Sequence, residues 1–148
     1  MSTKFIEKEE KIQEVIAKLT EESAKGKPII VEGKKDELAL RGLGISGAIL
    51  TVKTGGKSFL EAAAEIEKYG AFEVILLLDF DRRGKEGTLL LKQNLERSKI
   101  KANTRFWLDL KALTGREIQS IESLPSLLNA FKEKTHSVNL KKLIDTSF

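Results

Sequence analysis

The chain has 148 residues, of which 41% are apolar and 32% charged, and these proportions are typical of one globular domain rather than a disordered segment. The absence of cysteine excludes disulfide bonds and zinc sites built on thiolates, while the net charge of +4 permits an anionic partner without requiring one. The charged N-terminal segment is unlike a signal peptide, and no apolar run approaches the roughly 20 residues that span a bilayer. We therefore expect a cytoplasmic protein without a membrane partner.

Apolar patterning predicts helices and strands that alternate along the chain. In order, we expect a helix over 4–25, a strand over 29–31, a helix over 34–41, a strand over 48–52, a helix over 57–69, a strand over 72–78, a helix over 84–97, a strand over 104–108, a helix over 125–134 and a short segment, 138–144, that docks on the body. This alternation predicts an α/β, Rossmann-like fold with a mostly parallel four-stranded sheet flanked by helices.

The same patterns predict a single domain with three parts. These are an N-terminal helix over 1–26, a core over 27–112 and a C-terminal loop with a helical extension over 113–148. The first helix carries one apolar stripe, which includes Ile12 and Leu19, on a charged surface. That stripe suits packing on the chain's own sheet or on a second copy, so a homodimer or a larger protein assembly stays open.

Two acids follow the third predicted strand. The apolar run that begins at Ile75 stops at Asp79, and Asp81 follows one residue later. Such runs are typical of strands buried on both faces, and open α/β folds bind ligands at the carboxyl edge of the sheet. Neighbouring acids repel each other unless a cation joins them, and Mg²⁺ is suited to this because it prefers oxygen ligands. The alternative is that both acids simply end a strand.

An acid also follows the first predicted strand, where Glu32 precedes Gly33. Because the carboxyl ends of parallel strands share one edge, we expect Glu32 to lie near Asp79 and Asp81. We expect Gly33 and Gly84 to let the backbone turn sharply beside a ligand. The alternative is that Glu32 caps the helix that follows it.

Basic residues flank these acids on the same expected edge. Their position makes them candidates for binding the phosphates of a nucleic acid: Lys34, Lys35, Lys57, Arg82, Arg83 and Lys85. The alternative is an ordinary solvated surface, which is common in a chain with so many charges. Proximity to the acids favours phosphate contact, most of all for Arg82 and Lys34. Lys57, together with Lys53, belongs to a loop that we expect to approach the same edge.

The residues after the fourth predicted strand are less strongly patterned. Trp107 ends that strand and is predicted to belong to the core rather than to a platform for stacking bases. The polar segment 114–122 is expected to form a loop near the same edge of the sheet, where Arg116 is a further candidate for phosphate contact.

The two acidic motifs together resemble the Toprim domain. This domain occurs in topoisomerases, bacterial-type primases, recombination-mediator proteins, OLD-family nucleases and the small nucleases that mature 5S ribosomal RNA. The first motif of the family is similar to Val31-Glu32-Gly33-Lys34-Lys35-Asp36, and the second to Asp79-Phe80-Asp81-Arg82-Arg83-Gly84-Lys85-Glu86. The order of the motifs, their strand contexts and their separation all agree, and the resemblance covers about residues 28–108.

The resemblance implies a metal site and assigns its residues. In the family, the glutamate acts as a general acid or base and the two aspartates hold Mg²⁺. By position, Glu32 would transfer the proton and also contact the metal, and Asp79 and Asp81 would be the catalytic metal ligands. Mn²⁺ would be able to replace Mg²⁺.

These assignments predict Mg²⁺-dependent phosphodiester chemistry on nucleic acid, with hydrolysis of RNA or DNA as the first expectation. The chain is too short for the extra domains of topoisomerases and primases, so we expect a stand-alone Toprim protein. One alternative is a non-catalytic module that binds nucleic acid or protein in an RNA-processing, replication or repair assembly. Another is nucleotidyl transfer or the binding of a free nucleotide.

Overall fold

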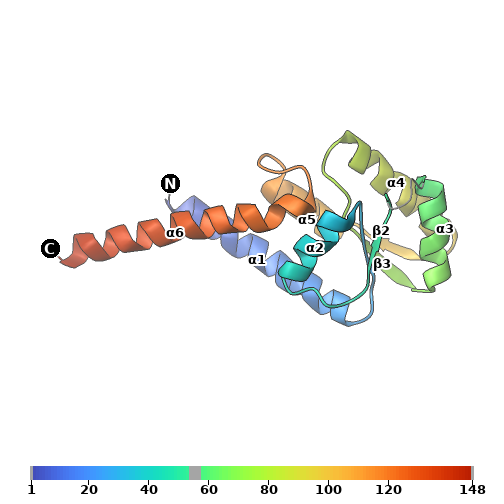
Figure 1. Ribbon diagram of the computed structural model, residues 1–148, viewed down its shortest axis with the longest axis horizontal. Coiled ribbons are helices and arrows are strands. Elements are labelled where there is room, and N and C mark those ends of the chain that lie inside the picture. The colour runs from blue at the N-terminus through green and yellow to red at the C-terminus, as the bar shows by residue number, and fades with distance from the viewer. Residues whose placement is uncertain (1, 54–57, 148) are drawn as a thin grey trace.

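A computed structural model of the protein describes residues 2–53 and 58–147 (Figure 1). Its elements are, in order, α1 (Ser2–Ala24), β1 (Ile29–Val31), α2 (Lys34–Gly42), β2 (Ile49–Thr51), α3 (Phe59–Tyr69), β3 (Glu73–Leu76), α4 (Arg82–Arg97), β4 (Lys101–Asn103), α5 (Arg105–Thr114), the 3₁₀ helix η1 (Ile121–Ser123) and α6 (Leu124–Ser147). Within these residues, no helix is both long enough and apolar enough to cross a membrane.

The four strands form one parallel sheet in the order β2-β1-β3-β4. The predicted α/β fold with a parallel four-stranded sheet is therefore confirmed. From β1 the chain moves outward to β2 on one side, and from β3 it moves outward to β4 on the other. The strand order thus reverses between β1 and β3, and a crevice at the carboxyl ends of two such strands is where α/β sheets bind ligands.

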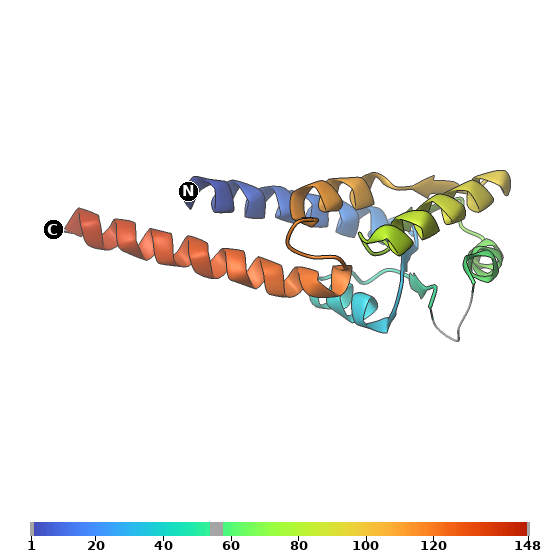
Figure 2. The same cartoon turned by 90° about the horizontal axis from the view of Figure 1, so that it is seen from above.

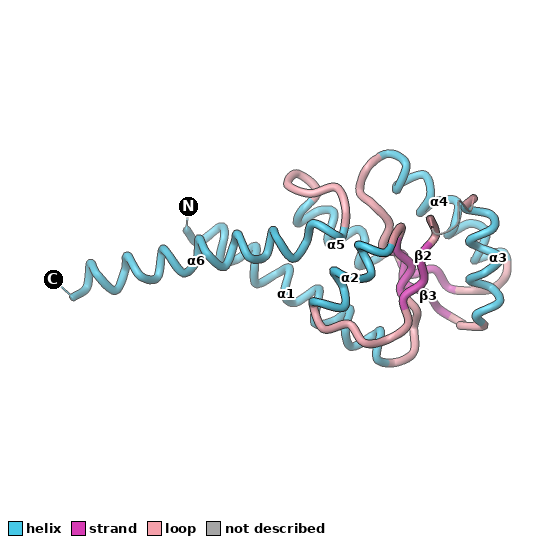
Figure 3. The backbone as a smooth tube through the Cα atoms, viewed as in Figure 1, coloured by secondary structure: helices cyan, strands magenta, loops and turns pink. Residues whose placement is uncertain are grey.

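Helices cover both faces of the sheet, and Figures 1 to 3 show the short strands enclosed between them. On one face, α1, α2, α5 and α6 contribute to a core that includes Ile12, Leu40 and Phe131. On the other face, α3 and α4 contribute Ile66 and Leu91 to a second core. Successive strand residues point to opposite faces, so a strand that is covered on both faces is apolar throughout. This arrangement explains the uninterrupted apolar runs in the sequence.

The helices α1 and α6 lie side by side and project together from the sheet (Figures 1 and 2). The rings of Phe5 and Phe131 join them, with centroids 5.9 Å apart. The apolar stripe of α1 is buried within the chain, since Ile12 and Leu19 are fully covered. The predicted docking of 138–144 on the body is wrong, because these residues continue α6. No glycine or proline follows Pro125, so nothing in the sequence ends this helix early.

The prediction of a fourth strand over 104–108 is also wrong. β4 lies at Lys101–Asn103, and Arg105–Thr114 form α5. The buried residues of α5 are Phe106, Trp107, Leu110 and Thr114, a spacing typical of one helix face rather than of a strand. Trp107 is 4% exposed and belongs to the core, as predicted.

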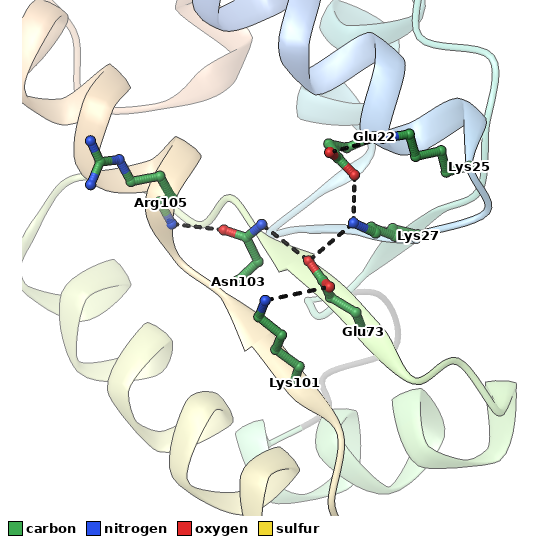
Figure 4. Close-up of polar contacts among 7 residues, drawn as sticks. All are labelled: Glu22, Lys25, Lys27, Glu73, Lys101, Asn103 and Arg105. Carbon is green, nitrogen blue, oxygen red and sulfur yellow. Dashed lines mark hydrogen bonds and ion pairs between the residues drawn. The ribbon is translucent and has the colours of Figure 1, made fainter.

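Ion pairs connect α1 to the amino end of the sheet (Figure 4). Glu73, at the start of β3, lies 3.5 Å from Lys27 and 3.8 Å from Lys101. Lys27 also pairs with Glu22 of α1 at 2.5 Å. We call Glu22, Lys27, Glu73 and Lys101 the amino-end network. Each of its carboxylates has a lysine partner.

Candidate active site at the carboxyl edge of the sheet

Glu32 and Asp79 meet at the point where the strand order reverses. Glu32 directly follows β1 and is only 2% exposed, and Asp79 ends the apolar run that continues from β3. Lys53, which follows β2, is bound to Glu32 twice. Its backbone N–H donates to the Glu32 carbonyl oxygen at 2.8 Å, and its Nζ lies 2.8 Å from Glu32 Oε2. The ends of three neighbouring strands therefore build this part of the site.

The two carboxyl groups share a single lysine. The other oxygen of Glu32, Oε1, is buried and has no hydrogen-bond partner in the described part of the chain. Burial, followed by the hydrogen bond to Glu32 and its negative charge, raises the pKa of Asp79 from 3.8 to about 8, while Lys53 opposes this shift. Near neutral pH the pair therefore retains a proton that one carboxyl group alone would lose. The hydrogen bond to Glu32 likewise raises the pKa of Lys53.

A pocket of about 370 Å³ opens over this pair. Three lysines line it, namely Lys34, Lys35 and Lys53, so its cations face its acidic residues. Gly33 and Asp36 also line it, and so do Ser120 and Glu122, which come from the segment between α5 and η1 and from η1 itself. The pocket thus combines carboxylates, which suit a metal ion, with cations, which suit a phosphate.

Asp36 attaches this wall to the first acidic motif. It is 5% exposed, and its two oxygens accept hydrogen bonds from the backbone N–H groups of Gly33 at 3.0 Å and Glu122 at 2.9 Å. Burial raises the pKa of Asp36, although both hydrogen bonds oppose the shift. The second motif is attached as well, because the N–H of Phe80 donates to the carbonyl oxygen of Gln119 at 2.7 Å. The expectation that segment 114–122 lies near this edge is confirmed.

Asp81 has a different environment from Glu32 and Asp79. It is exposed and caps α4, where its Oδ1 accepts a hydrogen bond from the N–H of Gly84 at 2.8 Å. Over residues 2–53 and 58–147, no group of three or more histidine, cysteine, aspartate or glutamate side chains is arranged to hold a metal. The structure therefore brings two of the three predicted acids together and places the third at a helix cap.

The two predicted turn glycines also differ from each other. Gly33 has an extended backbone that any residue can adopt, with φ of −145°, and a Cβ there would meet only Asp36, 4.0 Å away. Gly84 lies in the first turn of α4, where a Cβ would be 2.0 Å from the carbonyl oxygen of Asp79. Gly84 thus allows α4 to begin directly against the backbone of a site residue.

The predicted basic residues fall into two groups. Lys34 and Lys35 line the pocket over the acid pair. Arg82, Arg83 and Lys85 are exposed on the first turn of α4. Arg82 and Lys85 line a separate cavity between α4 and α5. Lys57 lies outside the described residues, and Arg116 is exposed.

The sequence did not predict that Asp36 connects the first motif to Glu122 through two backbone hydrogen bonds, which we call the Asp36 clamp. It also did not predict that Ser120 and Glu122 line the pocket. Lys53 received less weight than the neighbours of the acids. The position of Lys53 immediately after the second strand is a signal that was available, since all carboxyl ends of a parallel sheet share one edge. The contact of Asp36 with Glu122 joins residues 86 positions apart, and no local pattern predicts it.

The acid pair fits a hard divalent cation. Mg²⁺ binds carboxylate oxygens, and it commonly takes only one or two of them while keeping several waters. Glu32 and Asp79 provide two carboxyl groups, and the buried Oε1 of Glu32 lacks a partner among the residues described. A proton, a cation or a hydrogen-bond donor such as water can satisfy that oxygen. The raised pKa of Asp79 indicates that the pair favours keeping a proton when no cation is bound.

The parallel sheet with acids at two adjacent strand ends defines a domain of the Toprim type. The model of the Toprim domain matches residues 26–104, and the chain belongs to the Toprim family. Membership of this family links the protein to metal-dependent functions on nucleic acid.

Relatives are found among archaeal proteins called UPF0292. The protein from Methanosarcina acetivorans is 36% identical over 126 residues, which cover 85% of each chain. The protein from Methanocaldococcus jannaschii is 40% identical over 121 residues, which cover 81% of this chain and 91% of the relative. A solved structure, a putative protein from Aquifex aeolicus, is similar with a TM-score of 0.61 and 27% identity, over 75% of this chain and 95% of that one.

Proposed function

We propose that this protein is a Mg²⁺-dependent nuclease that hydrolyses phosphodiester bonds in RNA or DNA at the pocket above Glu32 and Asp79. The observation that carries this proposal is the pair of carboxyl groups, with Lys53 bound to Glu32 and a buried oxygen that has no partner among the described residues. A buried group of this kind is costly to maintain, and strongly shifted groups in a pocket are typical of functional sites. Membership of the Toprim family also supports a metal-dependent function on nucleic acid.

Each residue has a distinct part in this proposal. Bound Mg²⁺ would stabilise the negative charge that builds on the phosphodiester. Glu32 and Asp79 would hold the cation, and Glu32 would also move the proton that hydrolysis requires. Lys53 holds Glu32 in place, as its two contacts indicate. Asp81 contributes as a further ligand from the cap of α4.

Phosphate binding is assigned to the lysines at the pocket mouth and to the arginines that follow the second motif. Lys34 and Lys35 line the pocket beside the acids, so they are suited to the phosphate that reacts. Arg82 and Arg83 are exposed at the start of α4 and are suited to phosphates farther along the substrate.

The test is a cleavage assay with end-labelled RNA and DNA, both single-stranded and folded into hairpins. We expect products with Mg²⁺ or Mn²⁺, no products with EDTA, and loss of cleavage in the variant Asp79→Ala. Manganese binding, measured by calorimetry, should weaken in the same variant. Cleavage at the wild-type rate by Asp79→Ala would refute the assignment of this site.

A non-catalytic binding module is the second candidate, and one observation favours it. Among the described residues, no three acids gather closely enough to hold a metal, and Asp81 is used as a helix cap. Such a module would bind nucleic acid with the same surface and would give no product with any metal. The cleavage assay separates the two candidates, provided that binding of the same substrates is measured in parallel.

A further inference from the structure

A second cavity, of about 450 Å³, lies between α4 and α5. It begins at the carboxyl ends of β3 and β4, because Arg82 and Thr104, which follow those strands, both line it. We call it the α4–α5 groove. It is separate from the pocket over the acid pair, because the two cavities share no lining residue.

The groove has apolar walls and a basic rim. Leu89 of α4 and Leu108 of α5 line it, although they are 57% and 53% exposed. The cations Arg82, Lys85 and Lys92 line it as well, together with a single acid, Glu86, which is paired with Arg82 at 3.1 Å. Exposed apolar side chains with a rim in which cations outnumber acids indicate an interaction site for an anion that also has an apolar part.

The groove is connected to the acid pair through Trp107. This side chain lines the groove, and its Nε1 donates to the carbonyl oxygens of Leu78 at 3.0 Å and Asp79 at 3.3 Å. Its ring also packs on that of Phe80, with centroids 6.1 Å apart. A ligand in the groove would therefore lie next to side chains that are anchored to the backbone of the second acidic motif.

We propose that the α4–α5 groove binds single-stranded nucleic acid. Arg82, Lys85 and Lys92 bind backbone phosphates, and Leu89 and Leu108 contact an unstacked base. A nucleotide chain carries both features that the groove selects, whereas a duplex keeps its base faces stacked and out of reach. The volume lies near the lower end of the roughly 300–1,000 Å³ of small-ligand sites, which suits a nucleotide unit.

This inference rests on the proposed function and sharpens it, since it makes the substrate a single strand or an unpaired end. RNA and DNA share the phosphates and bases that the groove recognises, so both are included in the test. The chain also provides an internal probe, because Trp107 is its only tryptophan and lies in the groove.

The experiment is a titration of tryptophan fluorescence in EDTA, so that no cleavage takes place. The ligands are a 12-nucleotide RNA, the corresponding DNA and the duplex of that DNA. We expect both single strands to change the emission and to bind more tightly than the duplex. Leu108→Glu should weaken binding about tenfold, and Leu89→Glu, on the opposite helix, should do the same. Both residues are exposed, and circular dichroism checks that each variant is folded.

Lys92→Ala tests the phosphate contact. It should lower the slope of log affinity against log salt by about 0.7, the value for one phosphate contact on a single strand. The matched control is Lys132→Ala, which removes an exposed lysine from α6 and should leave affinity and slope unchanged. Wild-type affinity in both leucine variants would overturn the proposal, and so would binding of the duplex as tightly as the single strands.

Two further comparisons separate this proposal from the nuclease proposal. Asp79→Ala should bind single strands as the wild type does in EDTA, whatever its activity. A protein that binds through the groove but never cleaves would refute the nuclease proposal alone. A protein that cleaves and is indifferent to Leu108→Glu, Leu89→Glu and Lys92→Ala would refute the groove alone.

Discussion

The sheet has a charged cluster at each end, and the two clusters differ in how their acids are paired with cations. In the amino-end network, Glu22 and Glu73 each have a lysine partner, and all the side chains are partly exposed. At the carboxyl edge, Glu32 and Asp79 share Lys53, and Glu32 is almost completely buried. In the first cluster each acid is paired with a lysine, whereas among the described residues at the carboxyl edge Lys53 is paired with Glu32 and acts on Asp79 as well.

This difference separates a structural role from a functional one. Paired charges that remain partly hydrated contribute little to stability, and their loss is tolerated. A buried carboxyl group without a full complement of partners opposes folding unless a proton or a cation joins it. The raised pKa of Asp79 indicates that the carboxyl edge belongs to this second kind, in which a carboxyl group keeps a proton when no cation is bound.

The largest expected effect is on turnover. Glu32→Gln keeps the size of the side chain but removes its charge and its capacity to accept a proton, so cleavage should fall about 10³-fold, within the range for a lost acid–base group. Glu73→Gln makes the same change in the amino-end network and should leave the rate within about twofold. Single-turnover cleavage at saturating Mg²⁺ measures both. Equal losses in the two variants would show that the two ends do not differ in function.

The next effect concerns stability and the wall of the pocket. Asp36→Ala leaves the N–H groups of Gly33 and Glu122 without their acceptor, which should cost about 3 kcal/mol. The control is Asp109→Ala, which breaks a 3.3 Å surface pair with Arg105 and should cost less than about 0.5 kcal/mol. Urea unfolding measures both changes. Similar losses of unfolding free energy in the two variants would contradict a stabilising role for the two hydrogen bonds of Asp36.

Much of the fold was accessible from the sequence because the strands are covered on both faces. A strand with two buried faces is apolar throughout, so the runs that end at Glu32 and Asp79 marked both the strands and their carboxyl ends. The rule that parallel strands share one edge then predicted that these two acids lie together. The paired acids alone suggested a cation, and the family resemblance added the role of Glu32 and the chemistry on nucleic acid.

The remaining details depend on contacts that local patterns do not encode. Phe106 and Trp107 are both apolar, and so short a run fits a strand as well as the buried face of α5. Asp81 suits a metal site or an N-cap equally well by residue type, and its hydrogen bond to Gly84 places it at the cap. The Asp36 clamp requires tertiary folding to bring Glu122 to the first motif.

A smaller effect is expected from pH. With a pKa near 8, Asp79 is mostly protonated at pH 6, so a cation must displace that proton to bind. Affinity for Mn²⁺ should therefore rise about tenfold per pH unit between pH 6 and 8 and level off above that, with about one proton released per ion at the lower pH. Calorimetry in buffers of different ionisation enthalpy measures both quantities. Affinity that does not change over this range would contradict the assignment of the proton to the acid pair.

A last effect is on stability, and its sign should differ between the two ends. Glu73→Gln removes a partly exposed ion pair and should cost less than about 1 kcal/mol, with the cost shrinking as salt is added. Asp79→Asn should instead stabilise the protein at pH 9. Because the folded state raises the pKa of Asp79, it retains a proton that the unfolded chain loses near pH 3.8, and the wild type loses stability as the pH rises toward 8. Thermal unfolding at pH 5 and pH 9 without divalent cations measures this difference. A destabilised Asp79→Asn at pH 9 would mean that the carboxyl edge, like the amino-end network, has already neutralised its acids.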